Sequence, residues 1–298
     1  MKVLRGIGIL LLGLILIVGA FIGYAYVKIN SQLNATFDIS DVADIPLPTE
    51  EAALAEGQRL YVTLGCIGCH GANGGGGVVV DDPMFGYFPA SNLTSGSGGV
   101  ANEYMGSDDW VRAIRHGVSP DGKPLVIMPS TEYGHLTDAD MSRIVAYLES
   151  LPPVNSDLKP MSIALPAKVM FAMDEAGITA ASTIDHKAVG PWDVEVGATA
   201  AYGEYLAARC AACHGENLDG NWQPPPGEPQ PTNITPHETG IGGWTLEQFT
   251  MAVQTGVRPD GSKLDPFMPW PYYAQLTDLE VEAIYLYLQT VAPVATEE

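Results

Sequence analysis

Cysteine is scarce in this 298-residue chain, and its placement excludes several kinds of protein. The four cysteines all fall in two pentapeptides, residues 66–70 and 210–214, each of which reads C-x-x-C-H. No thiol is left for a disulfide framework, for a cysteine nucleophile or for a cysteine metal ligand elsewhere. Any chemistry that needs cysteine sulfur must therefore occur at these two places.

Basic residues are also scarce: 14 Lys and Arg stand against 35 Asp and Glu, giving a formal net charge of −21. Such a chain has no basic patch for nucleic acid, and its charge favours a basic protein partner. The alternative interpretation is that the acidic residues only maintain solubility. Long runs of alternating apolar residues are absent as well, so little sheet is expected.

The C-x-x-C-H pattern is typical of covalent c-type haem attachment. Residues three and four apart on a helical turn share one face, so two sulfurs can bond the haem edge while the histidine reaches the iron. A single copy could be half of a zinc site or a redox dithiol, but two copies argue against coincidence. The predicted thioether residues are Cys66, Cys69, Cys210 and Cys213, and the predicted iron ligands are His70 and His214.

An internal repeat follows the two motifs, and it is the strongest evidence for domain organisation. From the glycine of G-V-x-P-D-G onward, the matched positions are separated by 139 or 140 residues. The chain is therefore predicted to use one haem module twice. The matched segments are 92–94 with 233–235, 117–122 with 256–261, 128–129 with 268–269, 136–138 with 276–278 and 144–148 with 284–288.

The repeat and the composition together predict five parts. They are a transmembrane anchor at 1–30, a tether at 31–48, a first module at 49–154, an interdomain segment at 155–196 and a second module at 197–298.

The N-terminal segment is predicted to span a membrane. Residues 6–27 carry no charge, and 22 residues at about 1.5 Å each cover about 33 Å, enough for a hydrocarbon core about 30 Å thick. Lys2 and Arg5 precede this stretch and Lys28 follows it, which favours a cytoplasmic N-terminus. The alternative is a cleaved signal peptide with its apolar region at 7–18.

Each module is expected to open and close with a helix. The opening helices are predicted at 50–64 and 198–209, and the closing helices begin at the capping sequences 137–140 and 277–280. A shorter helix is predicted between them in each module. It starts near Ser107 in the first, and at a full capping box, 245–248, in the second. A further short helix is expected at 167–176.

Methionine is the candidate for the second axial ligand of each iron, at Met128 and Met268. Both are followed by proline, and both precede the last predicted helix by a short loop. Recurrence at matched positions favours ligation over the ordinary role of a core methionine. The rival methionines and histidines lack a counterpart in the other repeat: Met84, Met105, Met251, His116, His135, His186 and His237.

Each repeat resembles a class I cytochrome c domain, in which C-x-x-C-H follows the first helix and Met-Pro precedes the last. The resemblance implies an all-α fold of two tandem class I cytochrome c domains with one N-terminal transmembrane helix. Residues 231–287, including P-T-N-I-T-P-H-E-T-G-I-G-G-W and G-V-R-P-D-G, are similar to the cytochrome c subunit of membrane-bound quinoprotein alcohol and sugar dehydrogenases. Met268 falls where that family places its axial methionine. That family usually carries three haem modules, whereas this chain has two.

These observations predict a membrane-anchored cytochrome with two covalently bound haem c groups that transfers single electrons. Histidine and methionine fill both axial positions of each iron, so no catalytic residue is expected. One alternative is a dihaem enzyme such as a peroxidase. The other is the electron-accepting subunit of a quinoprotein dehydrogenase.

The expected partners are redox proteins of a respiratory or photosynthetic chain. They comprise a membrane-bound oxidoreductase or terminal oxidase, a basic soluble redox protein, and the lipid bilayer through the N-terminal helix. No nucleic acid is expected. The chain is predicted to be a single-pass subunit of a complex in the cell membrane, with its haem domains on the periplasmic side.

Overall fold

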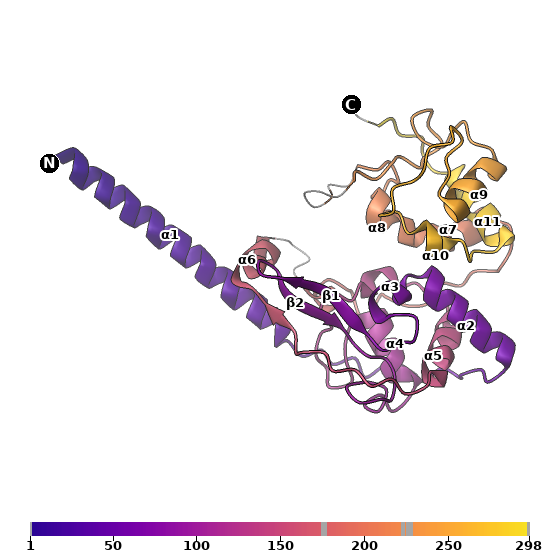
Figure 1. The fold of residues 1–298 in the computed structure, drawn as a ribbon, viewed down its shortest axis with the longest axis horizontal. Coiled ribbons are helices and arrows are strands. Elements are labelled where there is room, and N and C mark those ends of the chain that lie inside the picture. Colours follow the sequence, from indigo (N-terminus) through magenta and orange to yellow (C-terminus); the bar gives the residue numbers. More distant parts are fainter. Residues whose placement is uncertain (1, 174–177, 222–223, 225–228, 297–298) are drawn as a thin grey trace. The chain divides into compact units, whose positions relative to one another are not determined.

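The computed structural model describes residues 2–173, 178–221, 224 and 229–296, and this part of the chain is mostly helical (Figure 1). The predicted helical fold class is confirmed, with one small sheet added. In chain order the elements are α1 (Lys2–Leu33), α2 (Glu51–Thr63), α3 (Cys66–His70), β1 (Gly77–Asp82), β2 (Gly86–Ala90), α4 (Ser107–His116), η1 (Ser130–Glu132), α5 (Asp138–Ser150), β3 (Ser162–Ile163), α6 (Leu165–Met173), η2 (Ala180–Ser182), α7 (Ala200–Ala207), η3 (Ala208–Cys210), α8 (Ala211–His214), α9 (Leu246–Thr255), α10 (Trp270–Tyr273) and α11 (Asp278–Leu288).

Helix α1 contains 32 residues and is long and apolar enough to cross a membrane. Most of its side chains up to Val27 are exposed on the protein surface, as a helix surrounded by lipid requires. The helix continues beyond the uncharged stretch at 6–27 and ends at Leu33.

The chain forms two compact units, each described here by itself. Unit 1 comprises Met1–Pro46, Cys69–Gly134 and Leu148–Val189, and unit 2 comprises Leu47–Gly68, His135–Tyr147 and Gly190–Glu298. Unit 1 thus holds α1, the sheet, α4 and α6. Unit 2 holds α2, most of α5 and the helices from α7 to α11.

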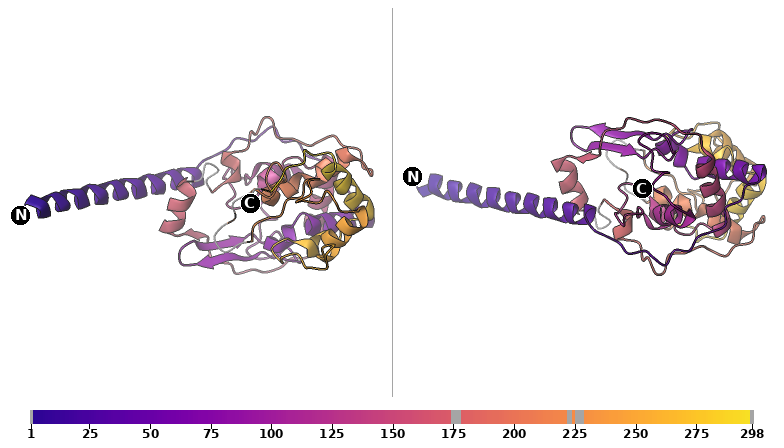
Figure 2. Two further views of the ribbon diagram at one scale, coloured as in Figure 1. Left: turned by 90° about the horizontal axis from the view of Figure 1, so that it is seen from above. Right: turned by 90° about the horizontal axis from the view of Figure 1, so that it is seen from below.

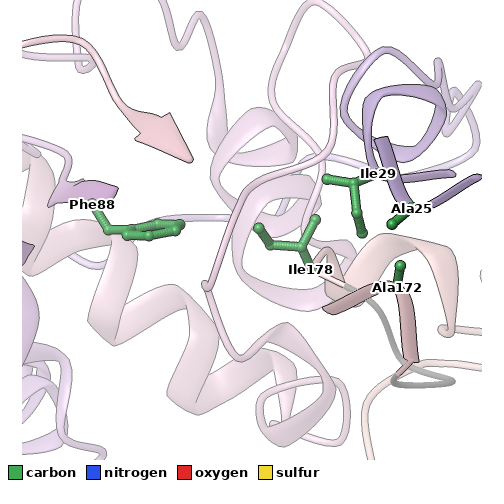
Figure 3. Packing of buried hydrophobic residues seen from close by; sticks show 5 residues of the cluster. All are labelled: Ala25, Ile29, Phe88, Ala172 and Ile178. Carbon is green, nitrogen blue, oxygen red and sulfur yellow. The ribbon is translucent and has the colours of Figure 1, made fainter. Parts of the chain in front are cut away.

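A hydrophobic core of unit 1 lies where the end of α1 meets α6 and β2 (Figure 3). Its buried side chains are Ala25, Ile29, Phe88, Ala172 and Ile178. Ala25 and Ile29 have no exposed surface, although most other apolar side chains of α1 are exposed. The end of α1 is therefore fixed to unit 1 by packed side chains.

The segment that follows α1 lies along unit 1 and is held there by hydrogen bonds. The Nε of Arg112 donates to the carbonyl oxygen of Ile39 at 3.1 Å. The backbone nitrogen of Ile45 donates to the hydroxyl of Ser107, the first residue of α4, at 2.7 Å. These residues are part of the predicted tether, and in the structure they contact the module they precede.

The small sheet also belongs to unit 1. Strand β1 pairs antiparallel with β2, which pairs antiparallel with the two-residue strand β3. The register of β1 and β2 shifts between Val78 and Val80, where an irregularity interrupts the ladder. Strand β3 leads directly into α6.

Two histidines of unit 1 form a hydrogen-bonded pair. The Nδ1 atoms of His116 and His186 lie 3.2 Å apart, and Nε2 of His186 lies 3.0 Å from the carbonyl oxygen of Ala181. A carbonyl oxygen only accepts, so His186 donates from Nε2 and its Nδ1 accepts from His116. Burial, together with the charges of His186, Arg115 and Arg112, lowers the pKa of His116 to about 4.

This pair predicts an acid-sensitive stability. Between pH 6.5, the ordinary histidine value, and about 4, the unfolded chain binds a proton at His116 that the folded chain does not bind. The free energy of unfolding is therefore expected to fall by up to about 3 kcal/mol as the pH drops through this window. Urea unfolding at pH 7 and pH 4.5 measures the change. His116→Gln should flatten the pH profile, whereas His237→Gln, at an exposed histidine bonded to Thr239, should leave it unchanged.

Unit 2 contains two helix crossings that each depend on a glycine. Helix α2 passes α5 at Gly57, where an added Cβ would overlap the carbonyl oxygen of Arg143. Helix α7 passes α11 at Gly203, where an added Cβ would overlap the carbonyl oxygen of Ala283. Any side chain at either glycine would force the helices apart. In both repeats, the opening helix thus crosses the closing helix at one close contact.

The helix starts follow the predicted capping residues. Thr245 with Gln248, and Thr277 with Glu280, form complete capping boxes. The hydroxyl of Thr137 accepts a hydrogen bond from Asp140 at 3.1 Å, at the start of α5. The helix expected at 167–176 is present as α6 up to Met173, and residues 174–176 lie outside the described residues.

A buried ion pair in unit 2 joins α2 to α11. The two terminal nitrogens of Arg59 donate to the two carboxylate oxygens of Glu280, each at 2.7 Å. Glu280 is only 4% exposed, and it also accepts from the backbone nitrogen of Thr277 at 2.8 Å. Hydrogen bonds to Glu56 and then Glu280 raise the pKa of Arg59. The buried carboxylate is thus fully paired.

Candidate haem-binding sites

Each C-x-x-C-H motif lies on a short helical segment. The first motif forms α3, and the second runs through the end of η3 into α8. The second helix ends at Gly215, whose φ of 80° stops the helix immediately after His214. A helical turn places the two cysteines of each motif on one face, with the histidine directly after them.

The histidines of both motifs are oriented by the same kind of hydrogen bond. Nδ1 of His70 lies 2.9 Å from the carbonyl oxygen of Ser91, and Nδ1 of His214 lies 2.6 Å from that of Thr232. Because the carbonyl accepts, Nδ1 carries the proton and Nε2 keeps its lone pair for a metal. Burial lowers the pKa of both imidazoles, which favours the neutral form that binds iron.

In the first module, Asn92 follows Ser91 and forms a set of hydrogen bonds with Thr94 and Val154, called the clamp below. The Oδ1 atom of Asn92 accepts from the backbone nitrogen of Thr94 at 2.9 Å and from its hydroxyl at 2.8 Å. The Nδ2 atom of Asn92 donates to the carbonyl oxygen of Val154 at 2.6 Å, and the backbone nitrogen of Val154 donates to the Thr94 hydroxyl. The clamp ties the end of the module to the segment that orients His70.

The second module repeats this clamp atom for atom. Asn233 accepts from the backbone nitrogen and hydroxyl of Thr235 at 2.8 and 2.7 Å. It donates to the carbonyl oxygen of Val294 at 2.7 Å, and Val294 donates to the Thr235 hydroxyl. The matched triplets of the repeat therefore brace the segments whose carbonyls orient His70 and His214.

A loop of identical geometry leads toward each candidate methionine. Gly117 and Gly256 end α4 and α9 with φ values of 67° and 71°. Their carbonyl oxygens accept from Leu125 and Leu264, each at 2.7 Å. A Cβ on Gly256 would collide with the ring of Trp270, so this position requires glycine for two reasons. G-V-x-P-D-G is thus a rigid bend that returns the chain from the middle helix.

Both methionines lie just before a short helix. The backbone nitrogen of Ser130, which begins η1, donates to the carbonyl oxygen of Met128 at 2.9 Å. Trp270, which begins α10, donates to that of Met268 at 2.8 Å. Both methionine side chains are half-buried.

Unit 2 contains a cavity of about 330 Å³ that brings the second set of predicted site residues together. Cys210, Cys213, His214 and Met268 all line it. Its other walls are largely apolar, as a haem requires. They include Leu206, Ile241, Trp244, Phe249, Ile284 and Leu288. The residues present therefore fit a haem. Residues 210–214 supply two cysteine sulfurs and one imidazole, and Met268 supplies a thioether sulfur from a loop that is distant in the sequence.

The first set of predicted residues is divided between the units. Cys66 belongs to unit 2, whereas Cys69, His70 and Met128 belong to unit 1. What the structure shows for this module is the orientation of His70, its clamp and the loop before Met128, each of which matches the second module.

The other methionines and histidines that were rival candidates for the iron are either exposed or engaged in other contacts. Met84, Met105 and Met251 are exposed, and Met251 does not line the cavity. His116 and His186 bond each other, and His237 bonds Thr239. His135 packs against the rings of Trp192 and Tyr205.

Comparison with known proteins decides the family. A model of the cytochrome c family matches residues 54–152 and 200–292, more than half of the chain. The chain belongs to the cytochrome c family. As a cytochrome c with two C-x-x-C-H motifs, it binds two haem c groups covalently.

Three relatives illustrate the range of cytochromes c that this chain is similar to. The fructose dehydrogenase cytochrome subunit of Gluconobacter japonicus is 47% identical over 103 residues, covering 31% of this chain and 21% of the relative. The cytochrome c subunit of the alcohol dehydrogenase (quinone) of Gluconobacter oxydans is 42% identical over 105 residues, covering 32% of this chain and 22% of the relative. The chain thus spans about a fifth of the length of these two relatives. A diheme cytochrome c-type protein of Cereibacter sphaeroides is 26% identical over 274 residues, covering 80% of this chain and 85% of the relative.

The thiol chemistry of this cytochrome c also argues against the redox-dithiol alternative. Burial raises the pKa of the Cys210 thiol to about 11. A redox-active C-x-x-C pair needs the opposite, a lowered pKa that gives a thiolate near neutral pH.

The clamp predicts a large loss of stability on truncation. Asn92→Ala removes three hydrogen bonds, two of them buried and one part-buried, and leaves the carbonyl of Val154 without its amide donor. We therefore expect the free energy of unfolding to fall by about 2–4 kcal/mol. Denaturant unfolding followed by circular dichroism measures the change. The matched control is Asn102→Ala, at an exposed asparagine that bonds Ser95, with an expected loss below about 0.5 kcal/mol. Equal effects from the two variants would contradict the role of the clamp.

Proposed function

We propose that this cytochrome c is a membrane-anchored electron carrier in which histidine and methionine of each module bind the iron. Cys66 and Cys69 hold the first haem by thioether bonds, with His70 and Met128 as axial ligands. Cys210 and Cys213 hold the second haem, with His214 and Met268 as axial ligands. The observation that carries the proposal is that Cys210, Cys213, His214 and Met268 all line the same cavity of unit 2.

The bound haem supplies one-electron chemistry, and the chain's own residues set the conditions for it. The carbonyl of Thr232 holds His214 with Nε2 free, and the largely apolar walls would surround the haem ring. Arg258, which also lines the cavity, offers a cation to the carboxylates of a haem. With both axial positions supplied by the chain, the arrangement supports outer-sphere transfer rather than binding of a substrate.

Carbon monoxide distinguishes this function from that of a dihaem peroxidase, which needs one iron with an open position. The purified full-length protein should contain two haem groups per chain and, once reduced, should bind carbon monoxide slowly at both. Rapid binding at one haem would show an open iron and support an enzyme.

The partner is proposed to be a membrane-bound dehydrogenase or another oxidoreductase that delivers electrons to this chain. Support comes from the relatives, which include a fructose dehydrogenase subunit and an alcohol dehydrogenase subunit. Helix α1 serves as a single-pass anchor, and Lys2 and Arg5 before its apolar stretch favour a cytoplasmic N-terminus with periplasmic haem modules. Solubilisation in mild detergent should recover a stoichiometric oxidoreductase partner. Recovery of the cytochrome alone, at every detergent concentration, would argue against a stable complex.

A second proposed partner is a basic redox protein that accepts the electrons. The net charge of −21 attracts a basic partner over a distance that shrinks from about 30 Å at 0.01 M salt to about 8 Å at 0.15 M. The rate of electron transfer to a basic acceptor should therefore drop steeply with salt, and the rate to an acidic acceptor should rise. Stopped-flow kinetics with the two acceptors measures how each rate depends on salt concentration. If neither rate changed with salt, the acidic surface would serve solubility and not partner recognition.

A further inference from the structure

An exposed apolar patch lies on unit 1 beside the membrane-spanning helix. Helix α6 exposes Leu165, Met170 and Met173, the last of these by 72%, and the turn between β1 and β2 exposes Met84 and Phe85. Figures 1 and 2 show α6 and this turn on the side of unit 1 toward which α1 extends. The two elements that carry the patch therefore lie on the side of unit 1 where a membrane must lie if α1 spans it.

Helix α6 is held firmly against the end of α1. Ala172 packs with Ala25 and Ile29 in the shared core (Figure 3). The ammonium group of Lys28 donates to the carbonyl oxygen of Ala172 at 2.9 Å. Lys168 donates to the side chain of Asn30 at 2.8 Å. The depth of α6 is thus tied to the depth of α1.

The position of Lys28 sets that depth. Residues 6–27 are uncharged and span about 33 Å, and Lys28 is the first charge after them, so it lies at the boundary of a hydrocarbon core about 30 Å thick. Ala172 bonds Lys28 directly, which brings α6 to the same level. Tyr26, with the ammonium of Lys168 4.4 Å from its ring centre, is the kind of aromatic residue that marks this interface.

The turn of the hairpin joins the same patch at the other end of α6. The backbone nitrogen of Ala164 donates to the carbonyl oxygen of Phe85 at 3.0 Å, and Leu165 follows at once as the first residue of α6. Asp82 accepts from the backbone nitrogens of Met84 and Phe85, so one carboxylate shapes the turn. Asp81 and Asp82 before the turn limit its insertion to the headgroup and upper acyl region.

We infer that α6 and the β1–β2 turn form a second membrane contact, in which their exposed methionine, leucine and phenylalanine side chains enter the interface of the bilayer that α1 spans. The inference rests on the proposed role of α1 as an anchor. An apolar surface at the level of Lys28 meets lipid as soon as α1 is inserted, without any movement of unit 1. Two contacts on one unit hold it in a fixed orientation above the membrane, which a single helix cannot do.

Photo-cross-linking of the full chain in phospholipid nanodiscs tests this contact. A photoreactive amino acid is placed singly at Met173, at Met105 or at Leu12, and lipid adducts are counted by mass spectrometry. Met105 is the matched control, since it is an 87% exposed methionine of unit 1 outside the patch. Visible spectra of each variant confirm that haem is bound and the protein is folded.

We expect lipid adducts at position 173 to be several-fold more frequent than at position 105, and abundant at position 12. Adducts at 12 but only control levels at 173 would overturn the second contact while leaving the anchor intact. Control levels at both 12 and 173 would overturn the anchor itself, and the second contact with it.

Discussion

Replacing Met268 with alanine is expected to remove half of the sulfur-to-iron charge-transfer absorbance of the oxidised protein. Met268 shares a cavity with His214, and Met128 holds the matched position in the first module, so each methionine should account for one of two equal contributions. A thioether ligand raises the reduction potential of a haem, and its loss should lower the potential of that haem alone. The vacated position should also bind carbon monoxide rapidly in the reduced state. Optical redox titration and carbon monoxide binding provide the two measurements.

Met251→Ala is the control for this experiment, because Met251 is exposed and lies on α9 without lining the cavity. Its spectrum and both potentials should match the unaltered protein. Met128→Ala should mirror the effect of Met268→Ala at the other haem. An unchanged charge-transfer band in either the Met128 or the Met268 variant would place that axial ligand elsewhere.

Arg59→Met is expected to cost about 3–5 kcal/mol of folding free energy. The change leaves the carboxylate of Glu280 buried at 4% exposure without its charge partner, and an uncompensated buried charge is far more costly than a lost surface pair. Denaturant unfolding measures the loss. Because Glu280 also caps α11 through Thr277, the damage should be concentrated where α2 meets α11, and hydrogen exchange in these two helices should accelerate.

A nearby pair that is less buried gives the control. Arg143 bonds Asp140 one turn away on α5, with 38% of its side chain exposed, so Arg143→Met should cost less than about 1 kcal/mol. The double variant Arg59→Met with Glu280→Gln should recover part of the lost stability, since no buried charge is then left alone. If the double variant proved no more stable than Arg59→Met, the cost would lie in packing and not in charge.

The features that sequence analysis predicted well are those set by local chemistry. Capping residues such as Thr245 and Thr277 act within one helical turn, so their role can be read without knowledge of the fold. The glycines of G-V-x-P-D-G likewise end their helices by backbone conformation alone. The recurrence of each feature then fixed the arrangement of helices in both modules.

Features that depend on distant contacts were not predictable in the same way. Strand β1 reads G-V-V-V-D-D without alternation, and its pairing depends on β2, which contains a proline, and on the two residues of β3. The carbonyls that orient His70 and His214 are backbone atoms and leave no mark in the sequence. Sequence analysis could have recognised Val154 and Val294 as matched positions of the repeat. Each follows a proline, and they stand 140 residues apart, which is the spacing of the rest of the repeat.

The clamp has a practical consequence for anyone who divides this chain. The match to the cytochrome c family ends at residues 152 and 292, and in each module the valine that closes the clamp lies two residues further on. A fragment cut at residue 152 therefore deprives the Nδ2 atom of Asn92 of its acceptor and loosens the backbone segment that includes Ser91, whose carbonyl orients His70, the proposed iron ligand. An isolated first module has to retain Val154 to keep His70 oriented as it is in the intact protein, although sequence similarity alone gives no reason to include it.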